Sequence, residues 1–246
     1  MPANRRDLPM PPTIVLVHGA FAESASWDRV VGTLQAAGHR VIAAANPLRG
    51  LTSDAAAVSD LVRTIDGPVV LVGHSYGGAV ISNVDADAGD IVGLLYVAAF
   101  APEPGESCIT LAGMFPGSTL GQALQPVPRS DGTTDLAIRL DRFRAQFAAD
   151  VPAAQAARMA ATQRPVTQEA LGAPSGKRPL WRERPSWFVF GDEDRNIPGA
   201  LQHYMARRAG AHRTLEIPGA SHAVSVAHPQ AIAALVLEAA AVRAAA

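Results

Sequence analysis

The chain alternates between short apolar runs and longer segments with the apolar spacing of a helix. The apolar runs are nearly continuous, as in strands that are buried on both faces of a sheet. They span residues 13–17, 40–44, 68–72, 91–100, 186–190 and 214–217. The helical segments span residues 27–37, 53–65, 198–210 and 229–245, with one more that ends at residue 83. This order predicts an α/β fold with a mostly parallel sheet of about six strands, covered by helices on both faces.

The alternation stops in the middle of the chain. Residues 103–184 hold proline- and glycine-rich loops and then helical runs at 134–149 and 152–162, without a convincing strand. We therefore expect residues 1–102 and 185–246 to form the core, and residues 103–184 to form a helical cap insertion. Such an insertion lies over the carboxyl edge of the sheet, where open α/β sheets bind their ligands.

Composition and charge narrow the choice of partners. The chain has 246 residues, 48% of them hydrophobic, and a formal net charge of −1, so we expect neither nucleic acid nor a membrane as a partner. No apolar run reaches the ~18 residues of a membrane span, and the N-terminal residues lack the apolar segment of a secretory signal. Cys108 is the single cysteine, which excludes an intrachain disulfide. These features favour a cytoplasmic protein, and nothing in the pattern specifies an oligomeric state.

The strongest chemical signal is the pentapeptide Gly73-His74-Ser75-Tyr76-Gly77, which stands between a predicted strand and a predicted helix. It has the G-x-S-x-G pattern of a serine on a sharp strand-to-helix turn. Glycines leave room for such a turn, because side chains there would collide with neighbouring backbone. The helix that follows directs its positive end toward the serine and favours negative charge there. The pattern predicts that Ser75 is a nucleophile, and the alternative is a glycine-rich turn with an incidental serine.

A serine hydroxyl needs a base to act as a nucleophile. Of the seven histidines, His222 lies in a loop of small residues directly after the last predicted strand, and His228, which precedes a proline, is the second choice. The base needs an anionic partner to hold its tautomer. Three acids follow the fifth predicted strand, namely Asp192, Glu193 and Asp194. The resulting chain order of serine, acid and histidine is the one expected for this type of sheet, but the pattern alone leaves the choice among the three acids open.

Acyl transfer also needs N–H donors for the oxyanion of its transition state. We expect one donor from the backbone of Tyr76, directly after the nucleophile, and one from the backbone of Ala20 in the loop after the first strand. A turn of small residues without a role is the alternative for Ala20. The sequence lacks H-E-x-x-H, a cysteine cluster, a P-loop and G-x-G-x-x-G, so we expect no metal site and no cofactor.

With these motifs the sequence resembles the compact α/β-hydrolases, which include bacterial esterases, plant methyl esterases and hydroxynitrile lyases. The matching segments are residues 15–21, 27, 37–39, 73–78, 191–194, 197–198 and 219–222. The resemblance implies the α/β-hydrolase fold, oxyanion donors at Ala20 and Tyr76, and an acid at the fourth residue of the Gly-x-x-Asp loop, which is Asp194. It further implies hydrolysis of a small carboxylic ester or lactone by a Ser-His-Asp triad, through an acyl-enzyme intermediate.

Two other functions are open on the sequence. The resembling lyases carry a threonine in the first-strand loop and a lysine beside the histidine. This chain has Ala20 and Ala223 at those positions, which argues against a lyase. A receptor that binds a small molecule without turnover would keep the same three residues, because function depends on the site and not on the fold.

An apolar substrate pocket is expected between the insertion and the catalytic residues. We expect its lining to come from Phe21, Phe100, Met114, Phe115, Phe143 and Phe147. The last two are four residues apart on a predicted helix and therefore share one face of it. For these two, packing of the insertion onto the sheet is the alternative.

Overall fold

A computed structural model describes residues 10–242 and contains a central sheet of six strands. The strands are β1 (Thr13–Val17), β2 (Val41–Ala44), β3 (Pro68–His74), β4 (Asp90–Val97), β8 (Ser186–Gly191) and β9 (Arg213–Ile217). All neighbours pair in parallel, in the order β2-β1-β3-β4-β8-β9. The predicted parallel sheet of about six strands is therefore confirmed.

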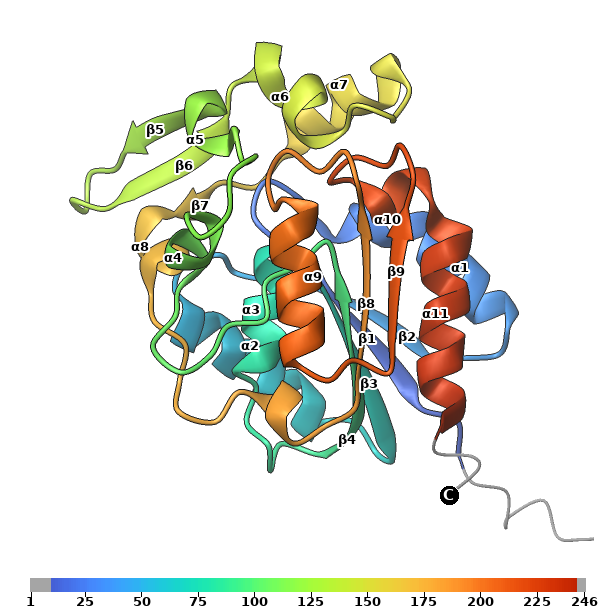
Figure 1. The fold of residues 1–246 in the computed structure, drawn as a ribbon. Helices are drawn as coiled ribbons and strands as arrows, with labels where there is room; N and C mark the ends of the chain where they lie inside the picture. The colour runs from blue at the N-terminus through green and yellow to red at the C-terminus, as the bar shows by residue number, and fades with distance from the viewer. Residues whose placement is uncertain (1–9, 243–246) are drawn as a thin grey trace, which may run out of the picture.

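Helices cover both faces of the sheet (Figure 1). On one face lie α1 (Asp28–Ala36) and α11 (Pro229–Ala241), and on the other lie α2 (Leu51–Arg63), α3 (Tyr76–Ser82) and α9 (Gly199–Arg208). Strand β1 shows why both faces are apolar: Ile14 and Leu16 join the core beneath α1 and α11, while Val15 and Val17 join the core on the other side. Successive side chains of a strand point to opposite faces, so a strand with two covered faces must be apolar at every position.

The remaining elements are short. Around the core they are the 3-10 helices η1 (Ser24–Trp27) and η2 (Leu180–Arg182) and the helix α10 (Val224–Ala227). In the middle of the chain they are α4 (Cys108–Ala112), α5 (Leu120–Ala123), α6 (Leu140–Phe147), α7 (Ala153–Thr162) and α8 (Gln168–Gly172). Residues 1–9, which carry most of the N-terminal segment expected not to be a secretory signal, and the end of the last predicted helix, residues 243–245, lie outside the described residues.

The insertion is not purely helical, and the expectation that it lacks strands is wrong. It contains an antiparallel sheet of β5 (Leu124–Pro128), β6 (Thr134–Ile138) and β7 (Val166–Thr167). The predicted helix over 134–149 is a strand in its first part, because the side chains at 134–138 are mostly buried between β5 and β7, and only α6 is helical. Figure 1 shows these elements above the carboxyl ends of the central strands.

An ion pair between the buried Asp135 carboxylate and a partly exposed arginine, Arg49, holds this small sheet on the core. The carboxylate of Asp135 on β6 accepts hydrogen bonds from Arg49 at 2.7 Å and from Arg129 at 3.0 Å. Arg49 belongs to the loop after β2, and the adjacent Leu48 carbonyl accepts a hydrogen bond from the Thr167 N–H on β7 at 3.1 Å. The insertion is therefore fixed to a loop at the carboxyl edge of the sheet, beside the predicted site.

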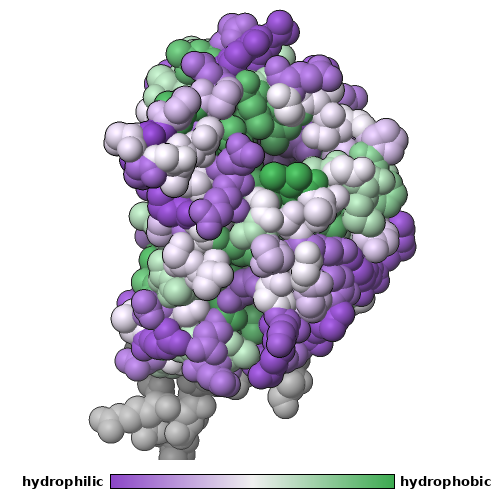
Figure 2. All heavy atoms as spheres, turned by 90° about the vertical axis from the view of Figure 1, so that its left-hand side faces the viewer, coloured by the Kyte–Doolittle hydropathy of each residue, from purple (hydrophilic) through white to green (hydrophobic). Residues whose placement is uncertain are grey.

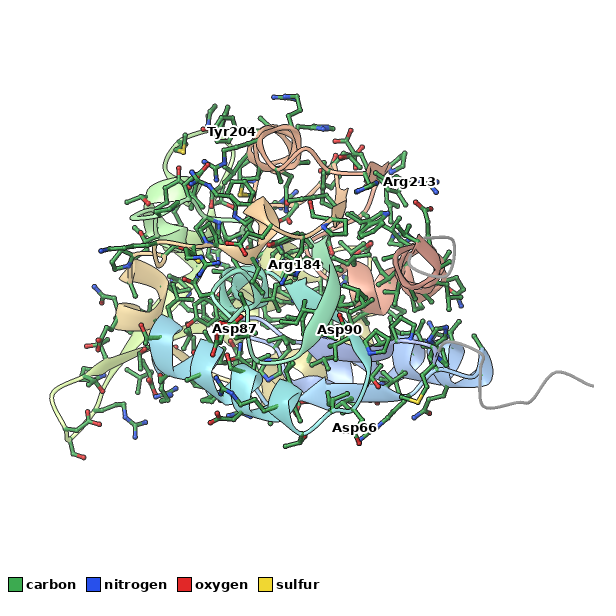
Figure 3. All side chains as sticks on the ribbon, turned by 90° about the horizontal axis from the view of Figure 1, so that it is seen from below. Asp66, Asp87, Asp90, Arg184, Tyr204 and Arg213 are labelled. Carbon is green, nitrogen blue, oxygen red and sulfur yellow. The ribbon has the colours of Figure 1, made fainter. Side chains whose placement is uncertain are left out.

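The opposite edge of the sheet is occupied by charged loop residues. Figure 3 shows this edge from below, with Asp66 before β3, Asp87 before β4, Asp90 at the start of β4, and Arg184 before β8. The guanidinium of Arg184 donates a hydrogen bond to the Ile91 carbonyl at 2.9 Å. None of the residues singled out from the sequence as catalytic comes from these loops.

Candidate active site

Ser75 stands on a strained turn between β3 and α3. Its backbone angles are φ 55° and ψ −123°, and a positive φ is disfavoured for any residue with a Cβ. Three backbone hydrogen bonds hold the turn: Ser75 N–H donates to Val97 (3.2 Å), and its carbonyl accepts from Gly78 (3.0 Å) and Phe100 (3.2 Å). The turn is therefore fixed by β4 and by the segment after it.

The two glycines of the pentapeptide are needed for close packing around this turn. A Cβ added to Gly73 would lie 2.5 Å from the carbonyl oxygen of Gly77, and a Cβ added to Gly77 would collide with the carbonyl oxygen of Val17 on β1. Either methyl group would push α3 away from the sheet. The spacing of the motif is therefore a packing requirement as well as a signature.

His222 and Asp194 lie in contact at the carboxyl edge of the sheet. The His222 Nδ1 and Asp194 Oδ2 atoms are 2.7 Å apart, and both side chains are fully buried. The other carboxylate oxygen of Asp194 accepts the N–H groups of Asn196 (2.7 Å) and Ile197 (3.0 Å). His222 Nε2 is buried and has no hydrogen-bond partner among the described residues. Its lone pair is therefore the one left to accept a proton.

The other two acids of the loop are elsewhere. Asp192 is exposed and its carboxylate accepts the N–H of Gly219 at 2.6 Å, which ties the two loops together. Glu193 is exposed. His228, the second choice for a base, pairs through Nε2 with Asp150 of the insertion at 3.1 Å. Of the three acids, Asp194 is the one in contact with His222.

A further histidine, which the sequence analysis did not single out, supports this pair. His74 is buried, and its Nε2 lies 3.0 Å from the backbone carbonyl of His222. A carbonyl oxygen only accepts, so His74 Nε2 carries the hydrogen. Burial, followed by the nearby His222 ring, lowers the pKa of His74 well below its usual value, so the ring is neutral. Its place beside Ser75 in the pentapeptide is the signal that could have revealed it.

The first-strand loop touches the nucleophile turn. A Cβ added to Gly19 would lie 2.6 Å from the Ser75 Cβ and 3.1 Å from the Tyr76 backbone nitrogen, so Ala20, the next residue, lies beside Ser75. Tyr76 is the first residue of α3, and the first N–H groups of a helix have no intrahelical acceptor. The side-chain hydroxyl of Tyr76 donates a hydrogen bond to the Asp54 carboxylate on α2 at 2.8 Å.

An apolar cavity of about 220 Å³ adjoins Ser75. Phe21 and Phe100, two of the expected pocket residues, line it together with Ala20 and Tyr76. The rest of its lining is Cys108, Ile109, Ala112, Ser118, Leu120, Gly121, Leu124, Leu136, Leu171, Asn196 and Ile197. Most of these residues come from the insertion, so the insertion supplies much of the wall. Burial raises the pKa of the Cys108 thiol, which keeps this part of the wall uncharged.

The cavity reaches the surface on the insertion side. Ile109 lines it and is 51% exposed. Figure 2 shows this side of the molecule, where hydrophobic side chains interrupt a largely polar surface.

The other four expected pocket residues do not line this cavity, because Met114 is exposed to solvent and the three phenylalanines pack against other rings. Met114 is 47% exposed after α4, and the Phe115 ring lies against Tyr204 at 5.6 Å. Phe143 and Phe147 are buried and stack at 5.0 Å, and the Phe147 ring also meets the His222 ring edge-on at 4.8 Å. The shared face of α6 therefore packs the insertion onto the histidine.

Within residues 10–242 there is no group of three or more His, Cys, Asp or Glu side chains that could hold a metal ion. Over the same residues, no helix has both the length and the apolar character needed to cross a bilayer.

A model of the alpha/beta hydrolase family matches residues 14–235. The chain belongs to this family. A pyrethroid hydrolase of Sphingobium wenxiniae is 30% identical to it over 244 residues, covering 89% of this chain and 84% of that protein. A carbendazim hydrolyzing esterase of a Nocardioides species is 36% identical over 110 residues, covering 39% of this chain and 46% of that protein.

Solved structures agree with the fold of this α/β-hydrolase. A pyrethroid hydrolase superposes with a TM-score of 0.75 at 25% identity, covering 95% of this chain and 99% of that one. Polyneuridine aldehyde esterase superposes with a TM-score of 0.77 at 19% identity, covering 93% and 99% of the two chains, which is a likeness of fold. Family, fold and relatives make this α/β-hydrolase an enzyme of the hydrolase class.

Proposed function

We propose that this α/β-hydrolase cleaves carboxylic esters with Ser75 as nucleophile, His222 as general base and Asp194 as the acid that orients the histidine. The observation that carries the proposal is the buried contact between His222 Nδ1 and Asp194 Oδ2 at 2.7 Å, with Nε2 left unpaired among the described residues. A carboxylate on Nδ1 keeps the proton there, so Nε2 is the basic atom. The relatives named as a pyrethroid hydrolase and a carbendazim hydrolyzing esterase support a hydrolase that acts on such bonds.

The reaction would proceed in two stages. The Ser75 oxygen attacks the ester carbonyl carbon while His222 Nε2 takes the hydroxyl proton, and the N–H groups of Ala20 and Tyr76 hold the oxyanion. The carbon–oxygen bond to the alcohol then breaks, and His222 returns the proton to the leaving oxygen. Water, deprotonated by His222, attacks the acyl-enzyme and releases the acid and the free Ser75 hydroxyl. No cofactor enters either stage.

In this proposal the insertion, residues 103–184, acts as the cap of the site. It supplies Cys108, Ile109, Leu136 and Leu171 to the wall of the Ser75 cavity. The cavity is almost entirely apolar, so it favours a hydrocarbon or aryl group next to the carbonyl.

The experiment is a panel of p-nitrophenyl, methyl and aryl esters and lactones, measured on the wild type and on Ser75→Ala. The wild type should turn over continuously, and Ser75→Ala should lose about 10⁴-fold or more in kcat, as when a triad serine is removed. Its melting temperature should stay close to that of the wild type. A wild type that forms one stable adduct and then stops would instead indicate a receptor, and a Ser75→Ala variant that keeps its activity would remove Ser75 from the mechanism.

A further inference from the structure

Two hollows of different size meet at Phe21. The smaller is the cavity of about 220 Å³ that contains Ser75, and the larger is a groove of about 620 Å³ between η1, α7 and α10. Phe21 is the one residue that belongs to both linings, and it is 3% exposed. Its ring therefore forms part of the wall between the groove and the nucleophile.

The groove has three walls. One is the first-strand loop with η1 and the start of α1, and another is the beginning of α10, where Ser225 and Val226 follow His222 closely in the chain. The third is a stripe along and beside α7 made of Pro152, Gln155, Arg158, Met159, Thr162 and Gln163. Of these, Gln155, Met159 and Thr162 recur every three to four residues and so share one side of the helix.

The proton transfer from His222 to the leaving alcohol determines which half of an ester fits which hollow. The leaving alcohol oxygen must take its proton from His222, so the alcohol half has to lie on the His222 side of Ser75. The groove is walled by the helix that begins two residues after His222. The lining of the cavity contains no residue from 218–228. The acyl half therefore belongs in the cavity and the alcohol half in the groove.

We propose that the groove is the subsite for the alcohol half of the substrate and that Phe21 determines how large this half can be. The inference rests on the proposed ester hydrolysis. A cavity of about 150 Å³ holds benzene, so the cavity beside Ser75 takes a compact apolar acid of about one ring. The groove lies within the range of about 300–1,000 Å³ that holds drug-sized ligands. The substrate class is thus an ester of a compact apolar acid with a large alcohol.

The groove differs from the cavity in polarity. Its rim carries Glu23, Asp28, Arg29 and Arg158, whereas the cavity lining has no charged side chain. A large alcohol with polar substituents at its outer end would be solvated by this rim. The same group would be excluded from the cavity, since an unpaired buried polar group is costly.

The backbone at Phe21 is held in place independently of its ring. Phe21 has φ 61°, and its N–H donates to the Arg164 carbonyl of the insertion at 3.1 Å. Alanine pays a similar penalty for positive φ, whereas glycine would relieve it. Phe21→Ala therefore removes the ring with little change in backbone preference, and Phe21→Leu gives an intermediate size.

The test uses two ester series: one acid with methyl, benzyl and naphthylmethyl alcohols, and one alcohol with acids of increasing size. Phe21→Ala should raise the kcat/KM ratio of naphthylmethyl to methyl ester by about tenfold, within the range that pocket shape provides, with Phe21→Leu in between. Because Phe21 lines the cavity as well as the groove, larger acids should also gain, but the alcohol series decides the assignment of the groove. A change in acid preference with unchanged alcohol preference would overturn the assignment of the two halves.

A second variant leaves Phe21 in place, so it tests the groove independently of any folding defect in Phe21→Ala. Met159→Trp fills the groove and should lower the naphthylmethyl-to-methyl ratio by about tenfold. Ala157→Trp is its control. Ala157 is exposed and lies two residues, or about 200° of helix rotation, from each of Gln155 and Met159. It therefore faces away from the groove. Equal effects of the two tryptophans would exclude the groove as a subsite. A wild type that hydrolyses no ester of either series would remove the proposed function itself.

Discussion

The contact between His222 and Asp194 joins residues that are 28 positions apart in the chain. They follow β9 and β8, which are neighbours in the sheet. Parallel neighbours end at the same edge, so side chains from the two following loops meet there. This is why the two loops that carry these residues could be found from the apolar runs that precede them.

The choice of Asp194 over Asp192 could not be made from that pattern. Only Glu193 separates them, and both lie in the same loop after β8. What distinguishes them is the path of the backbone, which directs Asp192 to the N–H of Gly219 and Asp194 to the imidazole. In the sequence analysis only the resemblance to a family pointed to Asp194.

Asp194→Asn should therefore lose far more activity than Asp192→Asn. An amide on Nδ1 favours the wrong tautomer and does not stabilise the imidazolium, and in a related triad this change lowers kcat by about 10⁴-fold. Asp192→Asn should lose much less, because its amide oxygen can still accept the Gly219 N–H. Steady-state kcat of both variants on one p-nitrophenyl ester checks this. If Asp192→Asn proved the more damaged variant, the role proposed for Asp194 would have to be abandoned.

At the scale of elements, the six central strands were predictable and the three strands of the insertion were not. Strands β1, β3, β4 and β8 are largely buried and appear as nearly continuous apolar runs, while the edge strands β2 and β9 are more exposed. Strand β5 contains Pro126 and Pro128 and is mostly exposed, and proline inside a run argues against a strand. Strand β6 is nearly continuous in sequence with α6, so its five residues merge with the helical pattern that follows.

Helix α6 was predicted to have Phe143 and Phe147 on one face, and the stack of their rings at 5.0 Å confirms this. What the face contacts could not be predicted, because His222 is 75 residues further along the chain than Phe147. Phe147 also lies against His74, with ring centroids 5.9 Å apart. One aromatic ring from the insertion thus packs on both histidines.

Phe147→Ala should destabilise the protein and slow all substrates alike. Phe147 is 1% exposed, and truncation of a buried phenylalanine to alanine costs about 3–5 kcal/mol. Loss of the ring beside His222 should lower kcat without changing the preference among esters. Urea unfolding together with kcat/KM for a short and a long ester measures both effects.

Leu140→Ala is the matched control on the same helix. Leu140 is 70% exposed, so its truncation should change the free energy of unfolding by less than about 0.5 kcal/mol. A Phe147→Ala variant of normal stability with a new ester preference would return Phe147 to the substrate pocket.

For the whole molecule, two buried histidines connect the site to the stability of the fold. His18 follows β1 and His74 ends β3, which are neighbouring strands. His18 Nε2 accepts the N–H of Asn46 at 3.1 Å, and His74 Nε2 donates to the His222 carbonyl at 3.0 Å. In each case burial is the main cause that lowers the histidine pKa below 6.5. The folded protein therefore favours the neutral, singly protonated form of both rings.

The protein should lose stability as the pH falls below about 6.5, with His74 responsible for part of the loss. Above the ordinary histidine pKa of about 6.5, which applies to the unfolded chain, both states are neutral and these histidines add no pH dependence. Below it the unfolded chain binds protons that folded His18 and His74 do not. The free energy of unfolding then falls by up to about 1.4 kcal/mol per pH unit for each ring. At this chain length, each kcal/mol corresponds to about 2–4 °C in melting temperature.

His74→Gln isolates the contribution of one ring, because its side-chain amide can still donate to the His222 carbonyl but does not titrate. Melting temperatures of the wild type and the variant at intervals between pH 7.5 and 5.5 give the two slopes. This window limits interference from carboxylates, whose ordinary pKa values lie near 4. The variant should have the shallower slope, since it retains only His18 of the pair. Parallel slopes would mean that folded His74 gains its proton as readily as the unfolded chain, and its buried contact with His222 would then not hold the ring neutral.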